Sequence, residues 1–279
     1  MVNYKYQDCI VSFIDILGFK NIVEDESVEK IVTILNRMKS FKPEENAYPA
    51  DHSGSKPYGF TMSDAIVRIL PLDFKYRDGA LAWELYELLL AQIELLELGV
   101  LIRGGVTIGK AYIGKNGDGP IFGPGIIRAY EIENKKATFP RIVLDNNVIK
   151  NFKENERLRS QDNSFEVELK IIKRFIKTDD KEVNFIDYLS DRHVGEYNSE
   201  YSDYYTFLQN HANLIRENLE KYKNTKPEVY KKYEWLASYH EETIAPQRIN
   251  AKEDDVKTFL NKEFDVDSEA FFEEITIKL

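Results

Sequence analysis

The chain has 279 residues, of which 43% are hydrophobic and 31% charged, a balance that excludes wholesale disorder and suits a large domain or a domain with an appendage. No apolar run reaches the roughly 18 residues that a membrane helix needs. Lys and Arg total 38 against 48 Asp and Glu, which gives a net charge of −10 and disfavours non-specific binding to nucleic acid or anionic membranes. We therefore expect neither a nucleic-acid partner nor a membrane partner.

The cysteine content and the first residues of the sequence indicate a cellular compartment. Cys9 is the single cysteine, which excludes an intramolecular disulfide and a thiolate zinc cage. The first residues, MVNYKYQDCIVSF, lack a cleavable apolar signal segment. Both features predict a cytoplasmic protein.

Hydrophobic spacing predicts alternating strands and helices over residues 9–145. Strands or hairpins are expected at 9–16, 58–70, 100–114 and 140–145. Helices are expected at 25–41, 80–99 and 122–136. This order predicts an α+β fold, a ferredoxin-like sandwich whose helices cover one face of a mainly antiparallel sheet.

The rest of the chain differs in character. Residues 184–190 predict an edge strand, and helices are expected at roughly 203–224 and 227–244, separated by a helix-breaking segment that ends in Pro227. The acidic and aromatic residues after 250 predict a solvated tail or a small docking segment. We therefore expect a domain over 1–149, a strand and helical extension over 150–249, and a C-terminal tail over 250–279.

Two aspartates stand out because they fall in or beside predicted strands. Asp15 closes the apolar run of residues 9–16, and Asp64 interrupts TMSDAIVRI. Aspartate is depleted in strands, and an unpaired buried carboxylate is costly. Carboxylates from adjacent strands can meet at one Mg²⁺ or Mn²⁺ site, where the ion keeps open positions for phosphate oxygens. The alternative is that one aspartate caps a turn and the other lies exposed on an edge strand.

Four short motifs occur along the first half of the chain, in the order FIDILGF (13–19), SDA (63–65), RGGVTIG (103–109) and FGPGIIRAYEIE (122–133). With these motifs in this order, the chain resembles class III nucleotidyl cyclases over about residues 9–145. The resemblance implies a cyclase-like catalytic domain over 1–149. It also implies that Asp15, Ile16 and Asp64 hold two Mn²⁺ or Mg²⁺ ions per site. The main-chain amides from Ile16 through Leu17, Gly18 and Phe19 would cradle the phosphates.

The chain departs from the family in the last motif. Ile127 occupies the position of the ribose-orienting Asn, and Glu131 the position of the Arg that stabilises the transition state. Because a carboxylate would repel phosphate, another cation is needed, and Arg103, Arg128 and Lys110 are the nearest candidates. The alternative for the two arginines is an ordinary surface salt bridge.

The positions that read adenine in adenylate cyclases also differ, since Tyr58 and Pro120 replace a Lys and an Asp. The Glu and Cys of guanylate cyclases are also absent. A large aromatic with a hydroxyl suits a smaller base, so the chain resembles the uridylate and cytidylate cyclases of bacterial Pycsar antiphage systems, and Tyr58 would contact the base. The alternative is that Tyr58 is an ordinary packed aromatic.

The resemblance predicts an enzyme that converts a pyrimidine nucleoside triphosphate, UTP in preference to CTP, to its 3′,5′-cyclic monophosphate and pyrophosphate. It further implies a homodimer with composite sites and a separate effector protein that the cyclic nucleotide activates. Two other functions remain open. One is a catalytically silent cyclase-like module that binds a nucleotide or a partner, and the other is a palm-type enzyme that makes oligonucleotide or cyclic dinucleotide signals.

Overall fold

The computed structural model describes residues 5–43, 57–114, 120–196, 201–250, 260–262 and 266–278. The chain divides into two compact units, Met1–Tyr188 and Leu189–Leu279. The boundary that the sequence predicts at 149/150 falls inside the first unit, because the strands that follow it belong to the same sheet.

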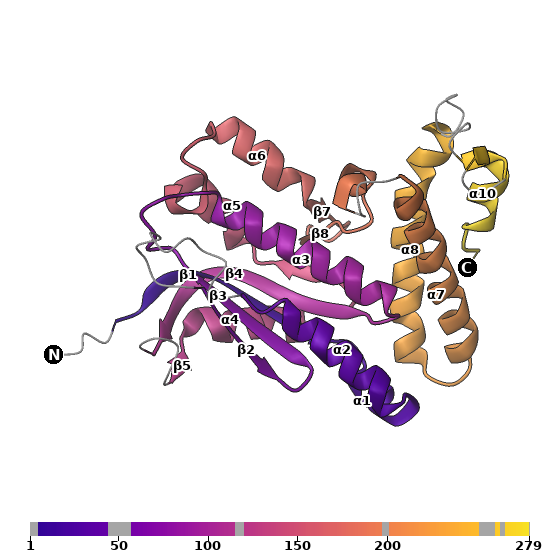
Figure 1. Cartoon of the computed structure of the whole chain (residues 1–279), viewed down its shortest axis with the longest axis horizontal. Helices are drawn as coiled ribbons and strands as arrows, with labels where there is room; N and C mark the ends of the chain where they lie inside the picture. Colours follow the sequence, from indigo (N-terminus) through magenta and orange to yellow (C-terminus); the bar gives the residue numbers. More distant parts are fainter. Residues whose placement is uncertain are drawn as a thin grey trace. The chain divides into compact units, whose positions relative to one another are not determined.

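The first unit is built on one sheet, which has eight strands in the described part of the chain. The strands are β1 (Gln7–Ile16), β2 (Tyr58–Met62), β3 (Ala65–Pro71), β4 (Ile102–Ile113), β5 (Ile121–Phe122), β6 (Ile142–Leu144), β7 (Ile176–Thr178) and β8 (Asn184–Ile186). Their order is β2-β3-β1-β4-β6-β8-β7, with β5 paired to β4 off this path. The pairing of β4 with β6 is parallel and the other pairings are antiparallel. A mixed α+β fold with a mainly antiparallel sheet is therefore observed (Figure 1).

The helices of the first unit lie on both faces of this sheet. They are α1 (Phe19–Asp25), α2 (Val28–Ser40), α3 (Ala80–Glu97), α4 (Pro124–Lys135), α5 (Asn147–Glu154) and α6 (Phe165–Arg174), with a 3₁₀ turn η2 at Glu156–Leu158. Val11 of β1 packs in one cluster with Ala129 of α4, whereas the neighbouring Ser12 hydrogen bonds to Glu84 of α3. Successive residues of a strand point to opposite faces, so α4 covers one face and α3 the other. The expectation that helices cover a single face is wrong, because β1 is apolar on both sides and both need cover.

Glycines let α4 approach the sheet closely. A Cβ at Gly105 of β4 would lie 2.4 Å from the carbonyl oxygen of Ala129, and one at Gly109 would lie 2.7 Å from Cα of Gly125. Any larger residue would push the helix away from the strand. The glycine-rich motif of β4 therefore serves strand–helix packing.

Most of the predicted elements of the first unit are present, and the unit also contains elements that the sequence did not predict, namely α1, α5, α6, β5 and β7. The predicted helix at 25–41 is α2, and the short α1 precedes it. Residues 184–186 form β8, which lies between β6 and β7 rather than at the edge. The edge strand on this side of the sheet is β7, whose three residues are too few to give a clear β pattern.

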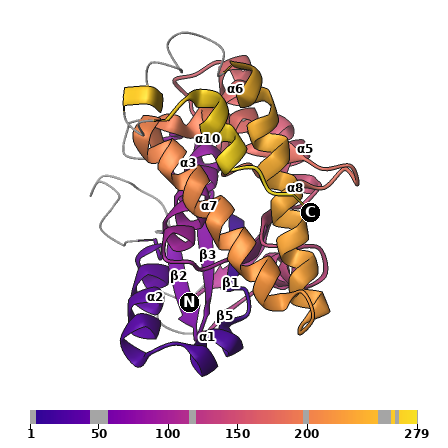
Figure 2. The ribbon, with the colours of Figure 1, turned by 90° about the vertical axis from the view of Figure 1, so that its right-hand side faces the viewer.

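The second unit is helical. It contains the 3₁₀ segment η3 (Asp191–Glu196) and the helices α7 (Tyr201–Tyr222), α8 (Pro227–Asn250) and α10 (Ser268–Glu274). Helices α7 and α8 pack side by side, and α10 lies against α8 (Figure 2). Phe271 and Phe272 of α10 are buried, so this part of the predicted tail is packed rather than solvated. No helix in the described part of the chain is long and apolar enough to cross a membrane.

Candidate functional site

Strand pairing brings Asp15 and Asp64 together at one end of the sheet. Asp15 is the penultimate residue of β1 and stands opposite Ala65 of β3. Pairing of Met62 with Ala65 leaves Ser63 and Asp64 as the two-residue turn of the β2–β3 hairpin, and Ser63 has φ 53°. The main-chain N–H of Ile16 donates to the carbonyl of Asp64 at 3.1 Å. Asp64 therefore lies in a turn beside the end of β1, not inside a strand.

The two carboxyl groups are close enough to perturb each other. Burial and the negative charge of the nearby Asp64 raise the pKa of Asp15, although Arg103 opposes the rise. Two carboxylates in one place disfavour full ionisation of both unless a cation lies between them. Carboxylate oxygens, together with a backbone carbonyl such as that of Ile16, are the ligands that Mg²⁺ and Mn²⁺ prefer. These donors have the chemistry that a divalent cation prefers, but the described part of the chain contains no group of three or more His, Cys, Asp or Glu side chains that could hold one.

Arg103 joins this pair from the facing strand. It stands opposite Asp15 in the β1–β4 register, and its Nη2 lies 3.2 Å from Oδ2 of Asp15 and 2.6 Å from Oε1 of Glu133 on α4. Glu133 is buried, and this burial, together with the negative charges of Asp15 and Asp64, raises its pKa although Arg103 opposes the rise. Arg103 is thus held between two carboxylates, which leaves it poorly placed to bind a phosphate.

Sequence reasoning missed Glu133 as a member of this cluster. Glu133 lies inside the quoted motif of residues 122–133, and its distance from Asp15 along the chain gave no sign of their proximity. One feature of the sequence could have indicated Glu133: it places a carboxylate on the face of α4 that also carries the buried Ala129 and Ile132.

The turn after β1 provides fewer free amides than expected. Gly18 has φ 77° and precedes the first residue of α1, Phe19. The N–H of Ile16 is used by Asp64, and the N–H of Leu17 donates to the carbonyl of Leu101 at 2.8 Å. Two of the four amides expected to cradle the phosphates, those of Ile16 and Leu17, are therefore already hydrogen bonded to carbonyl groups in this conformation. The amides of Gly18 and Phe19 remain at the start of the helix.

Tyr58 lies away from the two aspartates within the chain. It begins β2, pairs with Ile69, and is separated from the hairpin turn by the length of the strand, about 13 Å at 3.3 Å per residue. The half-buried Tyr58 ring lies 6.3 Å from the ring of Phe60, which packs against the core cluster under α4. Residues two apart share a face of a strand, so Tyr58 faces the α4 side of the sheet. Pro120 is exposed.

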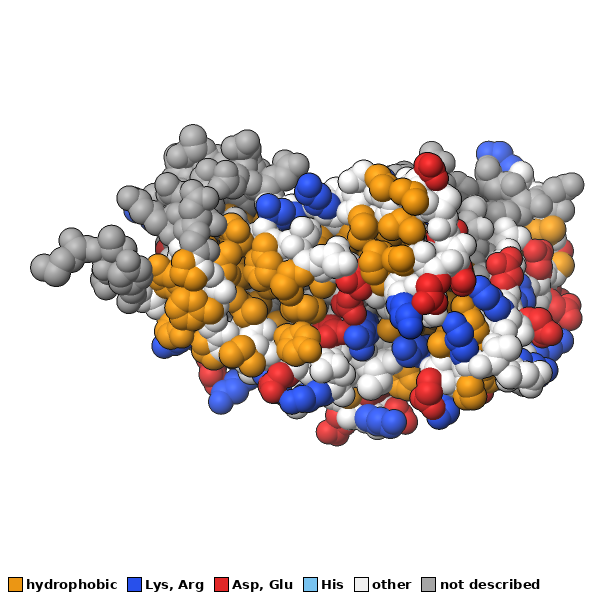
Figure 3. Space-filling view, turned by 90° about the horizontal axis from the view of Figure 1, so that it is seen from below, with side chains coloured by type: hydrophobic (Ala, Val, Ile, Leu, Met, Phe, Trp, Pro, Cys, Tyr) orange, Lys and Arg blue, Asp and Glu red, His pale blue; other side chains and the backbone are white. Residues whose placement is uncertain are grey.

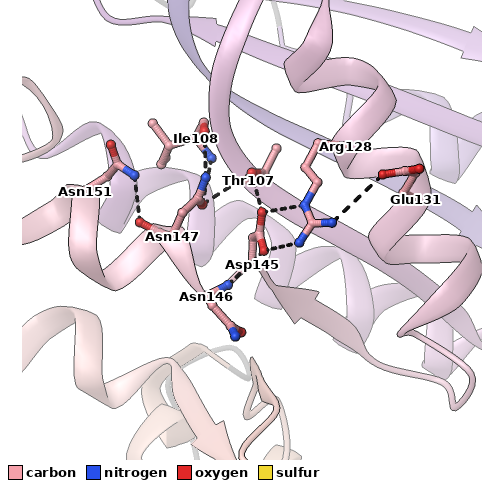
Figure 4. Close-up of polar contacts among 8 residues, drawn as sticks. All are labelled: Thr107, Ile108, Arg128, Glu131, Asp145, Asn146, Asn147 and Asn151. Carbon is pink, nitrogen blue, oxygen red and sulfur yellow. Dashed lines mark hydrogen bonds and ion pairs between the residues drawn. The ribbon is translucent and has the colours of Figure 1, made fainter.

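Arg128 belongs to a second polar cluster, between α4 and the end of β6 (Figure 4). Its Nε and Nη2 donate to Oδ2 and Oδ1 of Asp145 at 2.8 and 2.7 Å. Asp145 also accepts from the Thr107 hydroxyl at 3.0 Å and from the N–H of Asn146 at 2.9 Å. Burial opposes ionisation of Asp145, but the hydrogen bonds from Arg128 and Thr107 outweigh it and lower the pKa of this carboxyl. Asn147 completes the cluster by bonding its side-chain amide to the carbonyl of Ile108 at 3.0 Å.

The other sequence-predicted positions of this region lie on the outer side. Ile127 is 63% exposed, which suits a surface position but provides no ribose ligand. Glu131 forms an ion pair with Lys135 at 3.0 Å, one turn further along α4. Lys110 is exposed on β4. The structure therefore places Arg103 with the aspartates and Arg128 with Asp145, in two separate clusters.

An apolar surface accompanies α4 and β5. Figure 3 shows hydrophobic side chains gathered on this face of the first unit. Large apolar residues that are about half exposed include Tyr6, Phe122 and Tyr130. The ring of Phe122 lies 5.9 Å from that of Tyr6 and 5.1 Å from that of Tyr112, so the aromatic side chains are contiguous. Contiguous exposed apolar surface of this kind marks interaction sites.

Comparison with known proteins finds a distant likeness among solved structures. No family model and no curated protein matches the chain. Among solved structures, the chain is similar to a monomeric crystal structure of a double mutant of the guanylyl cyclase domain of the RhoGC fusion protein from the aquatic fungus Blastocladiella emersonii. The identity is 15%, the match covers 66% of this chain and 96% of that one, and the TM-score is 0.33. A likeness this distant assigns neither fold nor function.

Proposed function

We propose that the chain is a nucleotidyl cyclase that converts a pyrimidine nucleoside triphosphate to its 3′,5′-cyclic monophosphate and pyrophosphate. The observation that carries this proposal is the meeting of Asp15 and Asp64 at the end of β1, within four motifs that resemble those of class III cyclases. Burial and the negative charge of Asp64 raise the pKa of Asp15, as expected for two carboxylates close enough to share a cation.

Asp15, Asp64 and the carbonyl of Ile16 would hold two Mn²⁺ or Mg²⁺ ions. When bound, the metal lowers the pKa of the ribose 3′-hydroxyl and neutralises charge on the α-phosphate. Arg103 keeps the Asp15 carboxylate oriented along the sheet edge. The amides of Gly18 and Phe19 bind the phosphates.

Arg128 is the better candidate for the cation that contacts phosphate. Arg103 is engaged by Asp15 and Glu133, whereas the side chain of Arg128 is 42% exposed on α4. Phosphoryl transfer relies on positioned positive charge, and an exposed guanidinium next to the position of the family's arginine provides it.

A homodimer would bring the two halves of the site together. Tyr58 and Arg128 both lie on the α4 side of the sheet, away from the turn that carries Asp64. The apolar surface of α4 and β5 gives a second copy a face to bind, so that Asp15 and Asp64 of one chain meet Arg128 of the other. Tyr58 then selects a pyrimidine, since a large ring leaves little room for a purine. The preference for uracil over cytosine rests on the resemblance.

The proposed biological role is antiphage signalling, in which the cyclic nucleotide activates a separate effector protein in the cytoplasm. It rests on the resemblance alone. The silent-module alternative is favoured by one observation, the carboxylate of Glu131 at the family's arginine position.

Three matched Asp→Asn substitutions test the metal assignment. Asp15→Asn and Asp64→Asn should each lower turnover of the preferred triphosphate at least 100-fold in Mn²⁺ buffer, because each removes a metal charge and little volume. Asp8→Asn, on the same strand but exposed, should keep full turnover. Thermal melting should show that all three variants are folded. Full activity of either Asp15→Asn or Asp64→Asn contradicts the assignment.

A further inference from the structure

The guanidinium of Arg128 is held in one orientation by a buried acceptor. Asp145 contacts it side-on through Nε and Nη2, at 2.8 and 2.7 Å, and the Asp145 side chain is only 6% exposed. A planar guanidinium that makes two parallel hydrogen bonds to one carboxylate has little freedom to rotate.

Hydrogen bonds to the sheet and to the neighbouring backbone hold Asp145 in place. Oδ2 accepts from the hydroxyl of Thr107 on β4, and Oδ1 accepts from the N–H of Asn146. The N–H of Asp145 donates to the carbonyl of Val106 at 2.8 Å. Figure 4 shows this chain of contacts running from the strand through Asp145 to α4. The orientation of Arg128 is therefore set by β4 and β6 rather than by its own helix.

The side-on contact leaves the other edge of the guanidinium available. Arginine has five N–H donors, and Asp145 takes one on Nε and one on Nη2. Nη1 lies 3.9 Å from Oε2 of Glu131, beyond hydrogen-bond distance, and no other group in the described chain accepts from it. Glu131 forms this longer ion pair with Arg128 and a closer one, at 3.0 Å, with Lys135. An anion at the surface of α4 would meet two donors on Nη1 and one on Nη2.

We propose that Asp145 is a positioning residue for the cyclase reaction, holding Arg128 so that Nη1 and the free donor of Nη2 face the triphosphate. This proposal rests on the proposed function. A fixed guanidinium needs no reorganisation when charge develops on the phosphate oxygens, so its effect appears in the transition state more than in substrate binding. Thr107 supports the same orientation through Asp145.

A double-mutant cycle on the full-length protein tests this role. Arg128→Gln should lower kcat at least 100-fold and Asp145→Asn at least tenfold, each with less than threefold change in KM. If Asp145 acts through Arg128, the double variant should be no slower than Arg128→Gln alone. Thr107→Val should lower kcat less than Asp145→Asn, and this loss should also vanish when Arg128 is already Gln.

The melting temperature of each variant shows whether a lower kcat comes from a less stable fold or from a misplaced Arg128. Losses of kcat that multiply in the double variant, or an unchanged kcat in Asp145→Asn, overturn the positioning role. If Asp145→Asn does not fold, the Thr107→Val cycle gives the same decision. Failure of the positioning role can be distinguished from failure of the proposed function. If the wild-type protein turns over none of the four ribonucleoside triphosphates, both proposals are wrong. Wild-type turnover that is lost in Asp15→Asn but kept in Asp145→Asn rejects the positioning role alone.

Discussion

At the scale of single residues, the sheet contains a buried ion pair outside the candidate site. Arg68 of β3 donates to both carboxylate oxygens of Glu84 on α3, at 2.9 to 3.2 Å, and Ser12 of β1 donates to the same carboxylate at 2.7 Å. Arg68 also bonds to the carbonyl of Phe41, which follows α2. The cluster joins α2 and α3 to the strands that carry the two aspartates.

Removing one charge of this pair should be costly. Glu84→Gln leaves the Arg68 guanidinium, 4% exposed, without its counter-ion, and such a change costs about 3–5 kcal/mol of unfolding free energy. Glu87→Gln is the comparison on the same helix: burial raises the pKa of Glu87 although the charge of Arg68 opposes the rise, so loss of this carboxylate should cost less than loss of Glu84. Urea unfolding of both variants measures the difference. Equal unfolding free energies for the two would show that the pair is not structurally important.

At the scale of elements, two histidines join α7 and α8 in the core of the second unit. Nδ1 of His211 and Nδ1 of His240 are 3.0 Å apart, and Nε2 of His240 donates to the carbonyl of Ile275 at 3.0 Å. His240 then accepts at Nδ1, and His211 donates. This arrangement needs neutral rings, because a protonated His240 would place a second hydrogen between the two nitrogens.

The pair predicts that the second unit loses stability in acid. Burial lowers the pKa of His240 to about 4 and, with the neighbouring His240, holds that of His211 well below its usual value. A pKa lower in the folded state means that the unfolded state binds protons first, so stability is fully present above pH 6.5 and falls as the pH approaches 4. The loss from His240 is about 3 kcal/mol.

Tryptophan fluorescence measures this loss in the intact protein. Trp83 lies in the first unit and Trp235 in the second, so a Trp83→Phe background makes Trp235 a reporter of the second unit alone. Urea unfolding between pH 7 and 4.5 should show a steep decline that becomes shallower in His240→Gln, whose amide keeps donor and acceptor. Equal slopes would contradict the role of the pair.

At the scale of the whole molecule, the sequence predicts the elements better than their partners. The apolar run at the start of the chain and the long helix over 80–99 have strong periodic signals, and both are observed with shifted ends. The contacts of Glu133 and Asp145 depend on which strand lies beside α4, which no local pattern contains. The helices lie on both faces of the sheet because β1 is apolar on both sides. The sequence shows this continuous apolar run, but we expected helices on one face only.

The sequence predicts the candidate site only in part. Asp15 and Asp64 could be paired because each lies near the end of an apolar segment that predicts a strand, and carboxylates at the ends of adjacent strands can meet. Arg103 and Arg128 could not be distinguished, since each is an arginine near apolar residues. Their different ion-pair partners, Glu133 and Asp145, come from tertiary packing.

The most direct test of the central claim is the mass of the product made from each ribonucleoside triphosphate. Purified protein with Mn²⁺ and one of UTP, CTP, ATP or GTP should yield a nucleoside monophosphate lacking one water, with one pyrophosphate released per product, fastest with UTP. Tyr58→Ala should reduce the preference for pyrimidines while metal-dependent turnover persists, because the ring limits the size of the base. Equal rates with purines would reject the base assignment only. Dinucleotide or longer products, or no product from any of the four triphosphates, would contradict the cyclase account.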